Sequence, residues 1–144
     1  MAFVKILYTI IREKSTKEIN FNKKLGFLNR MCYNNKKGDV TMLKITEENF
    51  ELEIEKSNKL CVIDLYADWC GPCKMLAPVL EEIEKETPDV KFCKVNVDEE
   101  PNIARIFKVE SIPHVAFVKN NTYLDFSLGF VPKINLDKLI REYK

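Results

Sequence analysis

An apolar segment that leads into a pair of cysteines is the strongest constraint on how this chain can fold. Residues 61–67 (CVIDLYA) have the length of a strand and contain one acid, Asp64, as expected of a central strand buried on both faces. The sequence WCGPC follows at residues 69–73, and apolar residues then recur at helical spacing to about Glu86. We therefore predict a strand, a tight turn and a helix, the place where open α/β sheets carry their sites.

The rest of the pattern predicts an α/β domain. We expect a helix from Thr46, as its N-cap, to about Lys56, and a kink at Pro78 in the helix after the cysteines. Strands are predicted at residues 90–97, 115–119 and 123–128, and helices at residues 102–107 and 136–143. Helical crossovers make the first strands parallel, whereas a turn at residues 120–121 closes an antiparallel C-terminal hairpin. The expected architecture is a central mixed sheet flanked by helices.

Charge divides the chain near residue 41. Residues 1–41 carry 9 basic and 3 acidic side chains, whereas residues 42–144 carry 14 basic and 19 acidic ones. The first segment has no sustained hydrophobic period, so we expect it to be disordered or to reflect a misassigned start site. Its basic charge keeps a transit peptide as an alternative, although its apolar run at residues 6–11 is too short for a membrane span. We predict one folded domain over residues 42–144.

Composition indicates that function depends on a local site. The formal net charge of +1 gives no overall electrostatic field that would attract nucleic acid or an anionic membrane. Five cysteines in a chain of 46% hydrophobic residues favour a reducing, cytoplasmic location over secretion. Cys61 and Cys93 fall in predicted strands and are expected in the core, and Cys32 has no visible partner. Because only these residues and His114 could complete a zinc site with the WCGPC pair, we expect no metal.

The two cysteines of WCGPC suit redox chemistry. Being three residues apart at a helix start, Cys70 and Cys73 face the same side and are close enough for a disulfide. Pro72 fits the first helical turn, where its missing N–H would have no partner. The positive end of the helix lowers the pKa of Cys70 and favours the nucleophilic thiolate. Cys73, one turn inside, is expected to be more buried and less reactive.

These residues resemble the thioredoxin family over about residues 43–143. WCGPCK, at residues 69–74, is the hallmark of that family. Asp64 stands where the family has a buried acid beneath the active site, and Lys94 where it has a lysine near that acid. Pro78 matches a helix-kinking proline. The resemblance implies the thioredoxin fold, a mixed sheet flanked by helices.

The resemblance also implies a groove for an extended substrate segment. Residues 111–113 (Ser-Ile-Pro) resemble the segment that bears the family's cis-proline, and Gly129 its glycine beside the binding groove. The residues assigned to the groove are Trp69, Gly71, Pro72, Ile112, Pro113 and Gly129. His114, where the family usually has threonine, is either a structural histidine or a group that approaches Cys70 and stabilises its thiolate.

The implied activity is that of a protein-disulfide reductase. Cys70 attacks the substrate disulfide, and Cys73 resolves the mixed disulfide. Asp64, with a pKa raised by burial and moderated by Lys94, accepts the proton of Cys73. The chain has no Gly-rich nucleotide loop, so no cofactor is expected and electrons come from a thioredoxin reductase linked to NADPH or ferredoxin. The expected partners are proteins that contain disulfides, and the expected state is a monomer.

Two alternatives to the reductase stay open at this point. The same chemistry could run toward oxidation or isomerisation of disulfides, in which case the reduction potential of the cysteine pair would lie well above the range of reductants. A domain of this fold could also act as a binding module without turnover.

Residues 37–41 (KGDVT) generate a prediction about the start site. They can be back-translated into a purine-rich AGGAG ahead of an AUG for Met42, which is similar to a bacterial ribosome-binding site. We expect the gene to encode Gly38 as GGA within such a run, and sequencing the DNA checks this. Any other codon for Gly38 removes the only support for a start at Met42.

Overall fold

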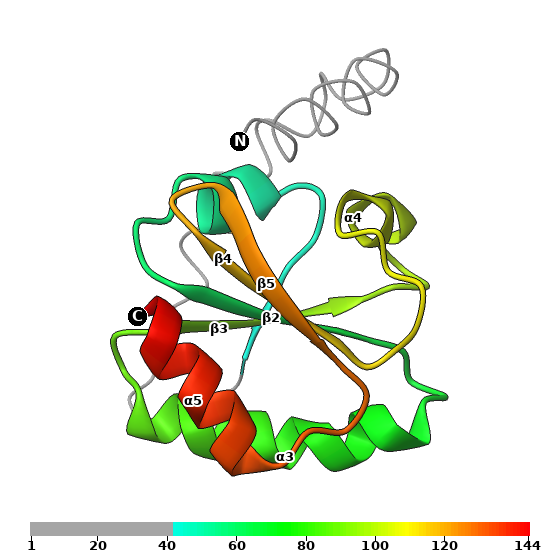
Figure 1. Cartoon of the computed structure of the whole chain (residues 1–144). Helices are drawn as coiled ribbons and strands as arrows, with labels where there is room; N and C mark the ends of the chain where they lie inside the picture. The colour runs from blue at the N-terminus through cyan, green and yellow to red at the C-terminus, as the bar shows by residue number, and fades with distance from the viewer. Residues whose placement is uncertain (1–41) are drawn as a thin grey trace. The chain divides into compact units, whose positions relative to one another are not determined.

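The computed structural model describes residues 42–144, and the expectations for residues 1–41 lie outside the described residues. Strands and helices alternate along this part of the chain (Figure 1). The strands are β1 (Leu43–Lys44), β2 (Cys61–Tyr66), β3 (Lys91–Asn96), β4 (His114–Lys119) and β5 (Thr122–Leu128). The helices are the π-helix η1 (Glu51–Glu55), α3 (Gly71–Glu86), α4 (Pro101–Ile106) and α5 (Lys133–Tyr143).

The strands form one mixed sheet in the order β1-β3-β2-β4-β5. β3 pairs in parallel with both β1 and β2, as expected for strands joined through helices. β4 runs antiparallel to β2, and β5 antiparallel to β4. The hairpin turn falls at Asn120 and Asn121, which have φ of 51° and 57°, a conformation that asparagine tolerates. The predicted mixed sheet and C-terminal hairpin are confirmed.

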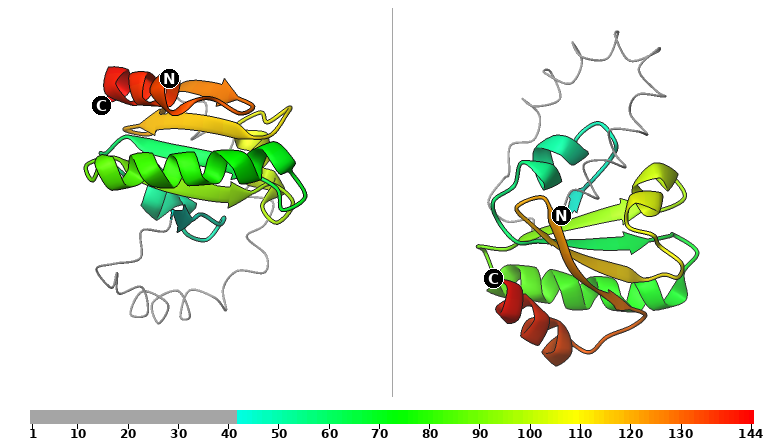
Figure 2. Two further views of the ribbon diagram at one scale, coloured as in Figure 1. Left: turned by 90° about the horizontal axis from the view of Figure 1, so that it is seen from below. Right: turned by 45° about the horizontal axis from the view of Figure 1, so that its top comes forward.

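Helices cover both faces of the sheet. Figure 1 shows α3 and α5 on one face and η1 and α4 on the other, and in Figure 2 α3 and α5 lie side by side. The cluster under α3 and α5 joins Leu80 and Ile83 of α3 to Val62, Phe117 and Leu136, all with at most 1% of their surface exposed. Leu80 and Ile83 fall at the helical spacing predicted from the sequence, and this face of α3 is buried against the sheet.

The opposite face has its own apolar layer. Phe50 and Phe107 meet edge to face there, with ring centroids 6.1 Å apart. Cys61 and Cys93 are free thiols with no exposed surface, which confirms the expectation that they lie in the core. Burial raises the pKa of both thiols, so they stay protonated and unreactive at neutral pH.

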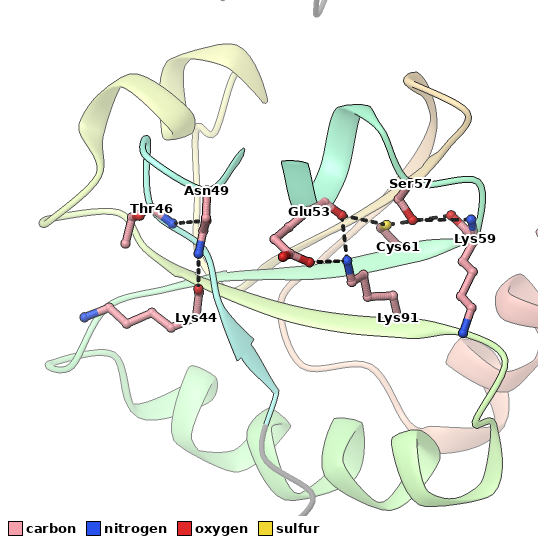
Figure 3. A network of polar contacts seen from close by, with 8 residues as sticks. All are labelled: Lys44, Thr46, Asn49, Glu53, Ser57, Lys59, Cys61 and Lys91. Carbon is pink, nitrogen blue, oxygen red and sulfur yellow. Dashed lines mark hydrogen bonds and ion pairs between the residues drawn. The ribbon is translucent and has the colours of Figure 1, made fainter. Parts of the chain in front are cut away.

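The predicted helix over residues 46–56 is wrong in its extent. The backbone N–H of Thr46 donates to Oδ1 of Asn49 at 2.9 Å, and a turn occupies residues 47–49. The Asn49 amide also donates to the carbonyl of Lys44 at 3.0 Å (Figure 3). The bond from Thr46 to Asn49 has the spacing of a capping box, and the N–H of Phe50 donates to the carbonyl of Thr46 at 3.0 Å, as in a helical turn. The start at Thr46 is therefore kept as a turn, and the regular element η1 covers Glu51–Glu55. β1 was not predicted, because two residues are too few for a hydrophobic period to appear.

Lys91 of β3 connects η1 to the sheet through polar contacts with Glu53. Nζ of Lys91 in β3 donates to the carbonyl oxygen of Glu53 at 3.0 Å and forms an ion pair with the Glu53 carboxylate (Figure 3). The side chain of Cys61 also lies near this carbonyl, with 3.9 Å between Sγ and the oxygen. Side chains of β2 and β3 therefore satisfy a carbonyl near the end of a short helix.

Packing on α3 gives a prediction about stability. Leu80 is fully buried, whereas Leu52 in η1 keeps 46% of its side chain exposed. We expect Leu80→Ala to lower the free energy of unfolding by about 3 kcal/mol, through lost burial and the cavity left behind. The matched change Leu52→Ala should cost less than about 0.5 kcal/mol. Urea denaturation of both variants measures this, and equal losses would contradict the assignment of the core.

Candidate active site

The cysteine pair lies at the turn between β2 and α3. β2 ends at Tyr66, Cys70 is the N-cap of α3, and Pro72 stands in the first helical turn. Cys70 and Cys73 form a disulfide, with their Cα atoms 5.3 Å apart. The strand, the turn and the helix are therefore where the sequence placed them, and both cysteines face the same side of the helix start.

The start of α3 is directed at the sulfur of Cys70. The backbone N–H of Cys73 donates to Sγ of Cys70 at 3.2 Å. A donor at the positive end of a helix stabilises a thiolate at this sulfur. Cys70 and Cys73 are almost equally buried, at 4% and 3% exposed, so the predicted difference in burial is not found. Position relative to the helix terminus distinguishes the two sulfurs, and burial does not.

An apolar groove runs beside Cys70. It encloses about 560 Å³. The residues that line it are Trp69, Cys70, Gly71, Pro72, Val97, Ala104, Val109, Glu110, Ser111 and Ile112. Four residues assigned to the groove from the sequence are thus brought together in its wall. Trp69 has 72% of its surface exposed.

Pro113 and Gly129 support the groove from behind. The Ile112–Pro113 peptide is cis, in agreement with the family resemblance. The backbone N–H of Gly129 donates to the carbonyl of Pro113 at 2.9 Å, and Gly129 has φ of +70°, which favours glycine. Pro113 is buried, and neither residue is among those that line the groove. The hydrogen bond between Gly129 and Pro113 holds the backbone next to Ile112.

A chain of polar contacts that holds Trp69 was not predicted from the sequence. Nε1 of Trp69 donates to Oδ2 of Asp98 at 2.9 Å. The Oδ1 of Asn96 accepts the backbone N–H of Asp98 at 3.0 Å, and the Asn96 amide donates to Asp68 at 3.2 Å. Asn96 is buried at the end of β3, which lies beside β2 in the sheet. Only this pairing brings residues nearly 30 positions apart into one network.

Asp64 and Lys94 lie beneath the disulfide. They are register partners on β2 and β3, and they share a cavity of about 270 Å³ with Cys73. Asp64 is 2% exposed, and its Oδ1 has no hydrogen-bond partner among the described residues. Burial raises the pKa of Asp64 from 3.8 to about 7, and the Lys94 charge moderates the rise. The structure therefore places both residues as the sequence suggested.

His114 lies within a group of aromatic rings. Its ring stacks on Phe126 with centroids 5.2 Å apart, and its Nε2 is 3.3 Å from the hydroxyl of Tyr123. Burial lowers the pKa of His114, which favours the neutral ring. These contacts favour the structural alternative for His114 over one in which a charged ring supports the Cys70 thiolate.

Metal-binding clusters and membrane-spanning helices are both absent from residues 42–144. No group of three or more His, Cys, Asp or Glu side chains in this range is arranged to hold a metal ion. In the same range, no helix is long and apolar enough to cross a membrane.

A dithiol pair at a helix start, beside a cis-proline and at the end of a central strand, defines a thiol–disulfide oxidoreductase. The thioredoxin family model matches residues 41–142. The chain belongs to the thioredoxin family, and its domain has the thioredoxin fold.

Individual relatives agree with this assignment. The thioredoxin of Buchnera aphidicola subsp. Acyrthosiphon pisum is 37% identical over 102 residues, which are 70% of this chain and 94% of that protein. Thioredoxin M5, chloroplastic, of Oryza sativa subsp. japonica is 40% identical over 98 residues, 67% of this chain and 57% of that protein. The crystal structure of oxidized mitochondrial thioredoxin 3 from Saccharomyces cerevisiae matches with a TM-score of 0.65 and 35% sequence identity. The match covers 70% of this chain and 94% of that chain.

Membership of this family settles the class of reaction. The protein is a protein-disulfide reductase that works by thiol–disulfide exchange. Thioredoxins act on proteins that contain disulfides and are themselves reduced by a thioredoxin reductase.

The buried carboxyl of Asp64 gives a prediction about stability and pH. Below about pH 4 it is protonated in both the folded and the unfolded chain, but between pH 4 and 7 only the unfolded chain loses the proton. Wild type therefore loses stability across this window, by several kcal/mol at about 1.4 kcal/mol per tenfold change in proton affinity. Asp64→Asn, neutral throughout, should match wild type near pH 4 and exceed its stability at pH 8. Urea denaturation at pH 4, 6 and 8 measures the difference, and a constant difference would refute it.

Proposed function

We propose that Cys70 is the nucleophile of the reductase. In the reduced protein its thiolate attacks a substrate disulfide, forms a mixed disulfide and releases the other substrate sulfur as a thiolate. The observation that carries this role is the N–H of Cys73, which is directed at Sγ of Cys70 at 3.2 Å. Since that donor favours the charged form of the sulfur, Cys70 is the better nucleophile of the pair.

Cys73 acts as the resolving cysteine. Its thiolate attacks Sγ of Cys70, so that the Cys70–Cys73 disulfide forms and the second substrate sulfur leaves as a thiolate. The two electrons pass from the cysteine pair to the substrate, whose disulfide is reduced to two thiols. The pair needs little movement for this step, because the cysteines occupy one helical turn and are bonded to each other in the structure.

Asp64 is the proton acceptor for the Cys73 thiol. The cavity that both residues line supports this role, and it has room for water between the two groups. A pKa of about 7 makes the carboxyl able to take up and release a proton near neutral pH. Lys94, on the neighbouring strand, acts through Asp64 as a positioning residue, because its charge keeps the pKa of Asp64 from rising further.

The apolar groove beside Cys70 receives the substrate chain. Trp69, Gly71 and Pro72 form one wall, and Ile112 the other. An extended segment lying between them presents its disulfide to Sγ of Cys70. Pro113 and Gly129 shape this site from behind by holding the Ile112 backbone. Removal of apolar surface from water supplies the binding free energy.

Electrons reach the protein from a partner, with no bound cofactor. The cysteine pair carries two electrons by itself, so it needs only a thioredoxin reductase, linked to NADPH or to ferredoxin, to restore the dithiol. We propose that the protein acts as a monomer in the cytoplasm, where its free Cys61 and Cys93 thiols would stay reduced. If residues 1–41 are a transit peptide, the location is an organelle, as the names of the rice and yeast relatives suggest.

Serine substitutions separate the roles of the two cysteines. We expect wild type to reduce insulin in the presence of dithiothreitol, and Cys70→Ser to lose at least 100-fold of this rate (on the order of an essential nucleophile). Cys73→Ser should attack but not resolve, and should accumulate mixed disulfides that mass spectrometry detects. Equal activity of wild type and Cys70→Ser would refute the role of Cys70. Trapping through Cys73 in Cys70→Ser would reverse the assignment.

A further inference from the structure

The substrate groove is uncharged except at one position. Nine of its ten lining residues are apolar or neutral, and the tenth is Glu110. Glu110 is exposed, and the structure of residues 42–144 shows no ion pair or hydrogen bond from its carboxylate. A carboxylate without a partner, at the edge of an apolar groove, is available to a charge that arrives with a ligand.

We propose that Glu110 is a specificity-determining residue that favours substrate segments with lysine or arginine beside the reactive disulfide. The inference rests on the proposed function, since it assigns a substrate class to the same groove. A basic side chain next to the disulfide would meet Glu110 when the disulfide is seated at Cys70. An acidic side chain in that place would meet like charge, which discriminates against it.

The backbone holds Glu110 at a fixed place relative to the cysteines. On its N-terminal side, the backbone N–H of Val109 donates to the carbonyl of Ala104 at 3.0 Å, which ties the segment to α4. On its C-terminal side, the carbonyl of Pro113 accepts the N–H of Gly129 at 2.9 Å, which ties it to the end of β5. Since both ends are anchored, the backbone of Glu110 is held beside the groove, within reach of a bound segment.

Charged residues of both signs adjoin the residues that line the groove. Asp98 follows Val97 and accepts a hydrogen bond from Trp69, so its carboxylate lies on the Trp69 side. Arg105 follows Ala104, and Lys108 precedes Val109. Glu110 is the one charged residue that lines the groove itself, and the proposal rests on it.

Three model peptides with the same intramolecular disulfide test the proposal. The residues beside the disulfide are lysine in the first, glutamine in the second and glutamate in the third. The measured quantity is the ratio of kcat/KM for the lysine peptide to that for the glutamate peptide, taken within each variant at low salt. Because both rates use the same thiolate, a change in Cys70 reactivity cancels from this ratio.

We expect wild type to prefer the lysine peptide by about three- to tenfold, the range for two exposed ion-pair contacts of opposite sign. Glu110→Gln should bring the ratio toward 1, and Glu110→Lys should bring it below the Gln value. Added salt of about 0.5 M should reduce the wild-type preference, because exposed charges are screened.

The matched control is Glu142→Lys, which makes the same charge change at the end of α5. That end is tied to the far side of the domain, where Lys144 pairs with Asp89 beyond the C-terminus of α3. The ratio of kcat/KM values for the lysine and glutamate peptides should be the same in Glu142→Lys as in wild type. An unchanged ratio in Glu110→Lys, or an equal shift in Glu142→Lys, would overturn the proposal. Failure of wild type to reduce even the glutamine peptide would instead count against the proposed function.

Discussion

The central strand β2 is the constraint on which the rest of the domain depends. It pairs with β3 on one edge and β4 on the other, and helices cover both of its faces. A strand that is paired on both edges and buried on both faces has one register. The end of β2 therefore fixes the position of the turn at Cys70. α3 begins there, and burial of its apolar stripe over the sheet directs its N-terminus at the sulfur. The position of Cys70 at the start of α3, on which its proposed reactivity rests, thus follows from the packing of β2 and α3.

The same burial makes Asp64 an unfavourable residue for stability. An ionised carboxyl at this depth has no hydrogen-bond partner on Oδ1 among the described residues, and the nearest compensation is the charge of Lys94 one strand away. Apolar side chains at the neighbouring core positions of β2 carry no such cost. Proteins accept such a cost at functional sites, and the raised pKa of Asp64 suits its proposed role as a proton acceptor near neutral pH.

Hydrogen bonds of the backbone and of side chains hold the residues around the groove in place. The carbonyl of Pro113 is held by Gly129, and Trp69 is held by Asp98, which Asn96 positions in turn. These bonds fix the two walls of an apolar groove before any substrate arrives, which reduces the ordering entropy that binding costs. The groove itself offers mostly apolar contact, and Glu110 is the one charged residue that lines it, which is why we propose that it selects among substrates.

The sequence alone determined the elements with a clear period and the cysteine turn, because these depend on neighbours within about one helical turn or one strand. It also indicated Asp64, since an acid inside an apolar run is conspicuous. It did not predict β1, and it predicted regular helix from Thr46, where the structure has a turn that leads into η1. The family resemblance already implied a lysine near Asp64. The Asn96 and Asp98 network and the place of Glu110 were decided by the tertiary structure. Each joins segments that only sheet pairing and the closing of loops over it bring together.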